Sequence, residues 1–292
     1  MSILVFGKTG QLALELAREL ALQGELTCLG REQADLSDPA ACAAVIGQMR
    51  PRAVINAAAY TAVDKAEEDE ALACVINGDT PGALARACAA LDIPFVHVST
   101  DYVFDGSGET PWRESDPVAP LNAYGRSKLL GEEAVRAAGG RFAILRTSWV
   151  VSSHGNNFVK TMLRLGAERD RLTIVADQIG APTAARDIAR TCLEVARQLA
   201  EDPAKAGTYH YAGAPETSWA GFAREIFARS DLAGADLSCE VEDIPSSAYP
   251  TPAPRPLNSR LDCALLETVF GIARPDWRQG LDAILKDLEI AT

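Results

Sequence analysis

The sequence has no cluster of basic residues, and its 292 residues carry a formal net charge of -12 at pH 7. A nucleic-acid partner needs a basic surface to hold its phosphates, so this charge argues against one. No apolar stretch approaches membrane-spanning length, and no basic leader precedes the apolar run Ile3–Phe6. We therefore expect a cytoplasmic protein with no membrane partner.

The sequence also lacks paired cysteine motifs. Its cysteines occur singly and are odd in number, without the spacing of a zinc site or a disulfide framework. We expect them to be small buried hydrophobic residues in a reducing compartment: Cys28, Cys42, Cys74, Cys88, Cys192, Cys239 and Cys263. The hydrophobic content of 48% and a mean hydropathy near zero are typical of an ordinary globular protein with two unequal domains.

What is present is a regular alternation of short apolar runs and segments with helical spacing. The runs predict strands, and the amphipathic segments between them predict helices. Such an order indicates a Rossmann-like, doubly wound parallel α/β sheet, with ligands at the carboxyl ends of its strands. The predicted strands are Ile3–Phe6, Leu26–Leu29, Ala53–Asn56, Phe95–Val98 and Phe142–Leu145, and the predicted helices are Gln11–Gln23, Asp38–Met49, Pro81–Leu91 and one that carries Tyr124.

The pattern changes after about residue 150. A polar loop at Asp177–Pro182 and a proline-rich stretch at Pro245–Pro256 predict a smaller, less regular C-terminal α/β region that binds the substrate. We place the cofactor-binding domain at residues 1–150 and the substrate-binding region at 151–292. The strand-like Leu172–Val175 and the helix Ala185–Leu199 are expected to pack back on the first domain.

Gly7, Gly10 and Ala13 form a glycine turn between the first strand and the first helix. Glycine permits a tight turn and a close backbone approach, and the helix N-terminus attracts phosphate through its free amides and its dipole. The turn is therefore a candidate dinucleotide site, although a plain strand-to-helix turn gives the same pattern.

The second strand ends at Leu29-Gly30-Arg31, where an NAD-selective site usually carries an acid. Arg31 is suited to a 2'-phosphate, which favours NADPH, but a solvated surface arginine fits the position equally well. Asp35 follows in a loop before a helix, where it is suited either to the adenine edge or to a helix cap.

Tyr124 and Lys128 are four residues apart and so share one face of a helix. In that arrangement the lysine charge favours the phenolate and prepares the tyrosine for proton transfer. The same spacing is also common on solvated helix faces. Ser99-Thr100-Asp101 stands at the end of a predicted strand upstream.

Taken together, these motifs resemble the extended short-chain dehydrogenase/reductases. The resemblance rests on the glycine turn, Asn56-Ala57-Ala58-Ala59, Ser99–Phe104 and Tyr124-x-x-x-Lys128. A narrower resemblance is to the dTDP-4-dehydrorhamnose reductase family, and it covers nearly the whole chain. It rests on Phe6–Gln11, Thr61–Glu67, Arg146–Val150, Gly155–Phe158 and Tyr249–Ala253.

The resemblance implies reduction of the C4 ketone of dTDP-4-dehydro-β-L-rhamnose by NADPH or NADH. It implies that Tyr124 donates the proton, that Lys128 binds the nicotinamide ribose and that Thr100 steadies the developing oxyanion. Asp101 and Trp149 match family positions that contact the sugar nucleotide, and Tyr102, beside them, is a further substrate candidate, although core packing also explains a tryptophan. The candidate cofactor residues from pattern and resemblance are Gly7, Gly10, Gln11, Leu12, Arg31, Asp35, Leu36, Ala59, Tyr60, Thr61, Tyr124 and Lys128.

Some positions depart from the family pattern. Tyr60 replaces a frequent histidine, Ala13 a glycine, and Val151-Ser152 a more usual tyrosine. Some members hold magnesium between two subunits through glutamates; Glu15 matches one of these, but Arg186 stands at a later one. A cation there opposes metal binding, so we predict no metal site and a monomer or weak homodimer.

Two other functions remain open. A related chain serves as the regulatory β subunit of methionine adenosyltransferase, and related sugar-nucleotide epimerases or dehydratases regenerate their own NAD. The intact Thr100, Tyr124 and Lys128 favour an enzyme over a regulatory subunit. Dehydratases commonly add a second acid after the threonine-aspartate pair, whereas Tyr102 stands here.

Overall fold

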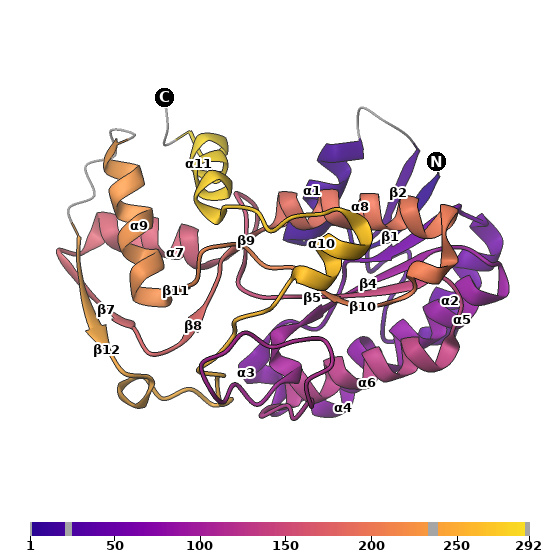
Figure 1. Ribbon diagram of the computed structural model, residues 1–292, viewed down its shortest axis with the longest axis horizontal. Coiled ribbons are helices and arrows are strands. Elements are labelled where there is room, and N and C mark those ends of the chain that lie inside the picture. Colours follow the sequence, from indigo (N-terminus) through magenta and orange to yellow (C-terminus); the bar gives the residue numbers. More distant parts are fainter. Residues whose placement is uncertain (1, 21–24, 233–238, 290–292) are drawn as a thin grey trace.

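A six-stranded parallel sheet forms the centre of the first half of the molecule (Figure 1). The computed structural model describes residues 2–20, 25–232 and 239–289. The strand order is β10-β5-β4-β3-β1-β2. In chain order these strands are β1 (Ile3–Phe6), β2 (Leu26–Leu29), β3 (Ala53–Asn56), β4 (Phe95–Thr100), β5 (Phe142–Thr147) and β10 (Gly207–His210).

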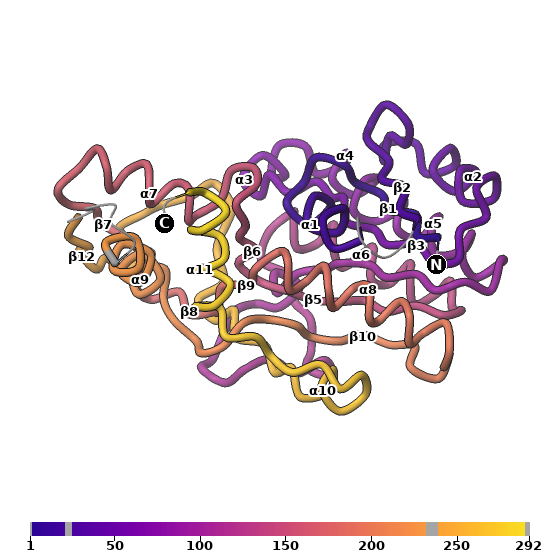
Figure 2. Tube along the Cα trace, turned by 90° about the horizontal axis from the view of Figure 1, so that it is seen from above, coloured from indigo at the N-terminus to yellow at the C-terminus, as the bar shows by residue number. Residues whose placement is uncertain are grey.

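Helices cover both faces of this sheet, which confirms the predicted doubly wound α/β class (Figures 1 and 2). Because both faces are covered, the central strands β1 and β3 are buried at every position. One face carries α1 (Gln11–Leu20) and α8 (Ala185–Glu201). The other carries α2 (Pro39–Met49), α5 (Thr80–Ala90) and α6 (Ala123–Ala138).

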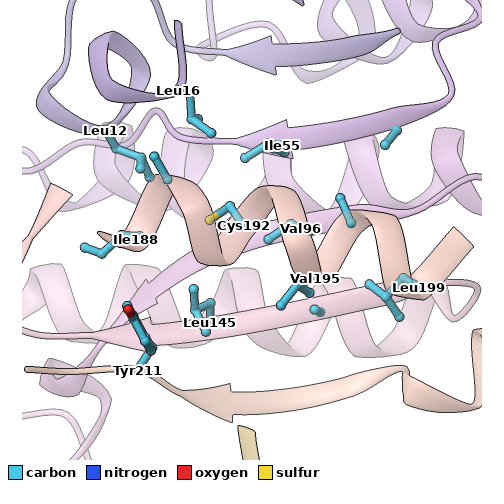
Figure 3. Packing of buried hydrophobic residues seen from close by; sticks show 14 of the residues in the cluster. Leu12, Leu16, Ile55, Val96, Leu145, Ile188, Cys192, Val195, Leu199 and Tyr211 are labelled. Carbon is cyan, nitrogen blue, oxygen red and sulfur yellow. The ribbon is translucent and has the colours of Figure 1, made fainter. Parts of the chain in front are cut away.

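The core between α8 and the sheet follows directly from helical periodicity. Ile188, Cys192, Val195 and Leu199 are fully buried and point toward the strands, where Figure 3 shows them beside Val96 and Leu145. Burial of an aliphatic side chain of this size contributes about 1.5–3 kcal/mol. This row of contacts fixes α8 on the sheet.

The helical segments before α5 are more extensive than the sequence predicts. Two short helices, α3 (Val63–Ala66) and α4 (Glu70–Cys74), precede a π-helical turn, η1 (Val75–Asp79), that runs directly into α5. Such turns interrupt regular helix hydrogen bonding and occur often at functional sites. The predicted helix at Pro81–Leu91 is therefore the last part of a longer helical segment.

A second core lies beside the sheet, at the left of Figures 1 and 2. It packs three helices against the parallel pair β7 (Arg171–Val175) and β12 (Glu240–Ile244). The helices are α7 (Phe158–Glu168), α9 (Trp219–Leu232) and α11 (Trp277–Asp287). Short strand pairs join the two cores: β6 (Val150–Val151) with β9 (Thr183–Ala184), and β8 (Ile179–Gly180) with β11 (Thr217–Ser218).

The two cores interleave along the chain. Helix α8, strand β10 and helix α10 (Ala264–Phe270) come from beyond residue 150 but belong to the first core, whereas β7 belongs to the second. The placement of a domain boundary near residue 150 stays a proposal. The remaining short helical turns are η2 (Asp101–Val103), η3 (Pro203–Lys205) and η4 (Ser246–Ala248).

Several predicted element ends differ from the structure. Strand β4 continues through Ser99 and Thr100, so both residues are part of the strand rather than of the loop after it. Helix α1 is described to Leu20, and the rest of the predicted helix, residues 21–23, lies outside the described residues. All seven cysteines are free; five are buried, and Cys28 and Cys74 are partly exposed. Within the ranges described, no helix is both long and apolar enough to cross a bilayer.

Candidate active site

The candidate site lies where the strand order reverses. Strands β1 and β3 are neighbours in the sheet, and the chain leaves β1 toward β2 on one side but leaves β3 toward β4 on the other. Ligands of doubly wound sheets bind in the crevice at this point. The glycine turn follows β1, and Ala57 follows β3; the Ala57 amide donates to the Phe6 carbonyl at 3.0 Å.

The geometry of the glycine turn leaves its backbone accessible. Gly7 has a φ of +126°, which disfavours any other residue, and a Cβ there would lie 3.4 Å from the Ala57 backbone. A Cβ on Gly10 would meet none of the described atoms within 4 Å, and α1 begins at the next residue. The open turn and the free amides at the helix N-terminus are together suited to an anionic group such as a diphosphate.

Gln11 connects this turn to the second core. Its Oε1 accepts hydrogen bonds from Ser152 Oγ at 2.9 Å and from Asn157 Nδ2 at 3.0 Å. Asn157 also caps α7, where its Oδ1 accepts from the Lys160 amide. Leu12, the next candidate, is buried in the first core, so only its backbone amide is available to a ligand.

At the end of β2, the two polar candidates form an exposed pair. Arg31 Nε donates to Asp35 Oδ2 at 3.1 Å, and the arginine side chain is 80% exposed. Asp35 also accepts from the backbone and hydroxyl of Ser37, whereas the cap of α2 is Asp38. Asp35 therefore shapes the turn and is not the helix cap. Leu36 is partly buried beside them, against the first core.

The loop after β3, which carries Ala59, Tyr60 and Thr61, is held by one buried side chain. Asn77, in the π-helical turn, accepts from the Tyr60 amide at 2.8 Å and donates to the Tyr60 carbonyl at 3.0 Å. Its Nδ2 also contacts Ser127 Oγ at 3.0 Å, next to Lys128 on α6. Asn77 thus ties the candidate cofactor loop to the candidate catalytic helix.

Thr100 and Tyr124 meet at the carboxyl end of β4. Asn122 caps α6 by accepting from the Gly125 amide at 2.8 Å, and this cap starts the helix immediately before Tyr124. The Thr100 hydroxyl faces the Tyr124 phenol and lowers its pKa. Thr100 Oγ1 also accepts from the Tyr102 amide at 3.2 Å, which fixes its rotamer. The Tyr102 ring packs edge-on against that of Tyr124, with 5.6 Å between their centroids.

Burial controls the pKa of Tyr124. It raises the pKa to about 12, and the hydrogen bond with Thr100 only partly offsets it. The effect of the Lys128 charge on the Tyr124 phenol stays a prediction. A tyrosine with this pKa is protonated at neutral pH and so can donate a proton.

Lys128 is 1% exposed, and its ammonium turns toward β4. Nζ donates to the Val98 carbonyl at 2.7 Å and lies 3.4 Å from His97 Nε2. Burial lowers the pKa of Lys128 to about 8, and the negative charge of Glu132 opposes that shift. The pKa of His97 is far below its usual value because the ring is buried and faces the lysine.

Asp101 is 3% exposed, and one of its oxygens is available for a ligand. Oδ1 accepts from Thr100 Oγ1 at 3.1 Å, whereas Oδ2 has no hydrogen-bond partner among the residues described. Burial raises the pKa of this carboxyl to about 6, against hydrogen bonds from Ser259 and Thr100. A buried oxygen without a partner beside the Thr100–Tyr124 pair is suited to a substrate hydroxyl.

Trp149 begins the connection from the sheet to the second core. Its φ is +49°, a strained value for a bulky residue that often marks a functional position. The ring stacks on Trp219 with 3.7 Å between centroids. A Cβ on Gly180 would lie 2.9 Å from the Trp149 ring, so this close approach requires glycine. Trp149 is partly exposed, so core packing alone does not explain its position.

A segment from the second half of the chain lies against the candidate site. We call residues 251–262 the strap; it runs from near α3 back to α10 (Figure 1). Arg255 Nη2 donates to Asp64 Oδ2 at 2.8 Å, and Asn122 Nδ2 donates to the Pro254 carbonyl at 2.8 Å. Ser259, also in the strap, lies close enough to Asp101 to lower the pKa of its carboxyl. Asp64 and Asp101 lie in motifs of the sequence, whereas Asn122 and Ser259 do not, and nothing local in the sequence indicates that these residues meet.

Glu15 and Arg186, which bear on the metal prediction, lie apart from this site. They line a cavity of about 260 Å³ between α1, α8 and α11. Arg186 Nε is 3.6 Å from Glu15 Oε2, and His154 Nε2 is 3.4 Å from Glu15 Oε1. A guanidinium occupies the place where a second carboxylate would be needed, so the absence of a metal site stays our prediction.

Comparison with known proteins places the whole chain in one family. The family model described as RmlD substrate binding domain matches residues 1–290. A dTDP-4-dehydrorhamnose reductase of Burkholderia thailandensis is 49% identical over 295 residues, covering 99% of both chains.

Solved structures give the same picture. The crystal structure of a dTDP-4-dehydrorhamnose reductase from Clostridium acetobutylicum has a TM-score of 0.92 and 37% identity, covering 99% of this chain and 100% of that one. A reductase of the same name from Bacillus anthracis, in complex with NADP, has a TM-score of 0.90 and 33% identity, with coverage of 98% and 99%.

Proposed function

Because the chain belongs to the RmlD substrate binding domain family, we propose that it reduces the C4 ketone of dTDP-4-dehydro-β-L-rhamnose to dTDP-β-L-rhamnose. It is an NAD(P)H-dependent oxidoreductase, and this reduction is the last step of dTDP-L-rhamnose biosynthesis. The observation that carries the proposal is that the Thr100 hydroxyl acts on the buried Tyr124 phenol, with Lys128 buried one helical turn beyond Tyr124.

The chemistry of ketone reduction requires a proton donor at the carbonyl oxygen, which gains negative charge as the carbon is reduced. Tyr124 is protonated at neutral pH, because burial raises its pKa to about 12. Its proton moves to the substrate oxygen as that oxygen becomes basic. Thr100 lies within hydrogen-bonding distance of Tyr124 and stabilises the same oxygen.

The residues present fit a dinucleotide cofactor. The Gly7–Gly10 turn and the first amides of α1 would hold its diphosphate, Asp35 and Leu36 would lie near the adenosine, and Ala59–Thr61 would line its path. Lys128 would hydrogen-bond the nicotinamide ribose. When bound, the reduced nicotinamide supplies the hydride. Arg31 ends a strand that carries no acid, which is compatible with either NADPH or NADH.

The substrate side of the site combines one carboxyl with several aromatic rings. Asp101 Oδ2 has no partner in the described part of the chain and is placed to bind a sugar hydroxyl. Tyr102 packs on Tyr124, and Trp149 stands on the side of the second core. These three residues orient the sugar so that its C4 oxygen faces Tyr124.

The wider setting of the protein follows from this function. The enzyme acts in the cytoplasm as a monomer or weak homodimer, without a nucleic-acid or membrane partner. Its product supplies rhamnose for lipopolysaccharide or cell-wall polysaccharide synthesis. The net charge of -12 and the helices described, none of which could span a bilayer, are compatible with this setting.

The test is a coupled assay that starts from dTDP-glucose and supplies NADPH or NADH, with the sugar nucleotide identified at the end. We expect oxidation of one or both cofactors in proportion to dTDP-rhamnose formed. Cofactor binding without oxidation would contradict the proposal and favour the regulatory subunit. Turnover to a different deoxysugar would keep the chemistry but change the substrate.

A further inference from the structure

Glu132 is a buried carboxylate that the mechanism above does not use. It lies on α6, four residues after Lys128, and is 0% exposed. A carboxylate without water is costly unless charge and hydrogen bonds compensate it, so its surroundings should show why it is there.

Four donors surround the Glu132 carboxylate. Arg146, on β5, donates from Nη2 to Oε2 at 2.6 Å and from Nε to Oε1 at 2.9 Å. Ser99 Oγ, on β4, donates to Oε1 at 2.7 Å, and Arg136 Nη1 donates to Oε2 at 3.1 Å. A carboxylate has about four acceptor positions, and here all are filled. The group holds α6, β4 and β5 together at one point.

These three elements carry the catalytic residues. Ser99 is followed directly by Thr100, and α6 carries both Tyr124 and Lys128. The distance between the Thr100 and Tyr124 hydroxyls therefore depends on how α6 sits against β4. Glu132 fixes that position from the interior, one helical turn beyond Lys128.

The charge of Glu132 also matters to Lys128. In the described part of the chain, no carboxylate lies within ion-pair distance of the Lys128 ammonium. Burial alone drives the lysine toward its neutral form, and Glu132 is the charged group that opposes this and holds its pKa at about 8. A neutral lysine could not stabilise negative charge in the site.

We propose that Glu132 is a positioning residue for the reduction, which sets α6 against the Thr100 strand and supplies the negative charge that keeps Lys128 protonated. The inference deepens the proposed function and rests on it. Glu132 acts through Lys128 and the helix, and it touches neither substrate nor cofactor.

Four other ionisable side chains face this point: His97 on β4, Arg146 on β5, His210 on β10 and Arg136 on α6. Burial lowers the pKa of His210 to about 3 and that of His97 well below its usual value, so both rings are neutral. The pKa of Tyr124 is about 12 and that of Asp101 about 6, whereas that of Lys128 is about 8. A loss of activity as the pH rises through 8 is therefore assigned to deprotonation of Lys128.

Two variants separate charge from geometry. Glu132→Gln keeps the shape and removes the charge, whereas Glu132→Asp keeps the charge and shortens the side chain. In Glu132→Gln we expect kcat/KM to fall at a pH about one unit lower than in the wild type. At pH values above both midpoints, kcat/KM should then be about tenfold lower than in the wild type. Glu132→Asp should keep the wild-type limb with a lower kcat. Glu133→Gln, at the exposed neighbouring position, should change neither.

A second measurement makes the inference independent of turnover. The titration of Lys128 can be followed by NMR of lysine labelled at 13Cε, with the signal assigned from Lys128→Met. We expect a midpoint near pH 8 in the wild type and about one unit lower in Glu132→Gln. If Glu132→Gln does not fold, Glu132→Asp, which keeps the charge, should give the wild-type midpoint near pH 8, and a midpoint about one unit lower in that variant would contradict the role of the charge.

The results separate the role of Glu132 from the proposed reductase function. An unchanged Lys128 midpoint and an unchanged alkaline limb in folded Glu132→Gln overturn the inference and leave the proposed function intact. A wild type that fails to oxidise either cofactor with the dTDP sugar overturns the proposed function, and the NMR midpoint then still decides whether Glu132 controls Lys128.

Discussion

Glu132 and Asp101 are both buried carboxylates near the catalytic tyrosine, but their surroundings differ completely. Glu132 receives four hydrogen bonds, two of them from Arg146, and its pKa is lowered despite burial. Asp101 has one oxygen without a partner among the described residues, and burial raises its pKa to about 6. The hydrogen bonds of Glu132 are thus all formed with its carboxylate ionised, whereas Asp101 can still accept a hydrogen bond.

This difference matches the proposed roles of the two groups. The proposed positioning residue has all its hydrogen-bond partners within the chain, so its position does not depend on a ligand. The proposed substrate group keeps a free acceptor, at a cost in stability. The predictions below test whether the two sides behave in these different ways, beginning with the catalytic residue between them.

The largest effect should come from removing the proton donor. Tyr124→Phe keeps the ring packed on Tyr102 and removes the hydroxyl that is bonded to Thr100. We expect kcat to fall by about 10²–10⁴ with nearly unchanged cofactor affinity, whereas Lys128→Ala should lower both. Stopped-flow turnover and cofactor titration measure the two quantities. Tyr249→Phe, at a tyrosine that is 62% exposed, is the matched control; near-normal turnover of Tyr124→Phe would show that the mechanism is wrong.

The next largest effect should be a loss of stability when the Glu132 carboxylate is removed. Glu132→Ala leaves Arg146 buried without its counter-charge, so we expect the free energy of unfolding to fall by about 3–5 kcal/mol. Urea denaturation measures the loss. Glu133→Ala on the same helix should stay within about 0.5 kcal/mol of the wild type. A small loss in Glu132→Ala would mean that the carboxylate is not the connection between α6 and the strands.

Asp101 and Glu132 should make the free energy of unfolding change with pH in opposite directions. Asp101 has a folded pKa of about 6 and an unfolded value of 3.8, so the folded state binds more protons between these limits. Its contribution is present below pH 3.8 and is lost as pH rises to 6. Glu132 has a lowered folded pKa, so its contribution is present above its unfolded value of 4.5 and is lost as pH falls.

Asp101→Asn should therefore be more stable than the wild type at pH 7, by up to about 3 kcal/mol, and similar to it near pH 4. Glu132→Gln should be less stable than the wild type at pH 7. Unfolding curves at several pH values measure both, with Glu133→Gln as control. If Asp101→Asn gains nothing at pH 7, the carboxyl has a partner that the contacts above do not include.

A smaller effect is expected at the end of β2, where Arg31 is mostly exposed. If its guanidinium meets a 2'-phosphate, Arg31→Ala should raise the KM for NADPH about fivefold and leave that for NADH unchanged, since an exposed ion pair contributes about 1 kcal/mol. Arg52→Ala, before the amino end of β3, is the control. An unchanged KM for NADPH would show that Arg31 does not contact the cofactor.

No effect is expected from metal removal. Arg186 lies beside Glu15, and within the described ranges no group of three metal-ligating side chains comes together. Light scattering should give the same mass with and without chelator. A dimer that dissociates on chelation would contradict the prediction.

Local sequence predicted the parts of the site that depend on one element. The four-residue spacing puts Tyr124 and Lys128 on one helix face, and Gly7 permits the turn after β1. The apolar runs gave the strands of the first domain, and the sheet class is confirmed. Strand β10 was not predicted, because a four-residue edge strand carries little signal of its own.

The contacts that the sequence could not predict join residues far apart in the chain. Ser259 reaches Asp101, Arg255 reaches Asp64, and Gln11 accepts from Asn157 only because the second core folds beside the sheet. No spacing rule covers such pairs. For the same reason, the spacing of four residues did not indicate that burial raises the pKa of Tyr124.

By itself the sequence determined the sheet, the glycine turn, and the helix face that carries Tyr124 and Lys128, because periodicity and glycine conformation act locally. The tertiary structure alone decided which buried charges are compensated. It placed Arg146 and Ser99 on Glu132, and left Asp101 Oδ2 without a partner among the described residues. The charge state of a buried group depends on what surrounds it in space, and in this protein those surroundings come from the sheet, α6 and the strap.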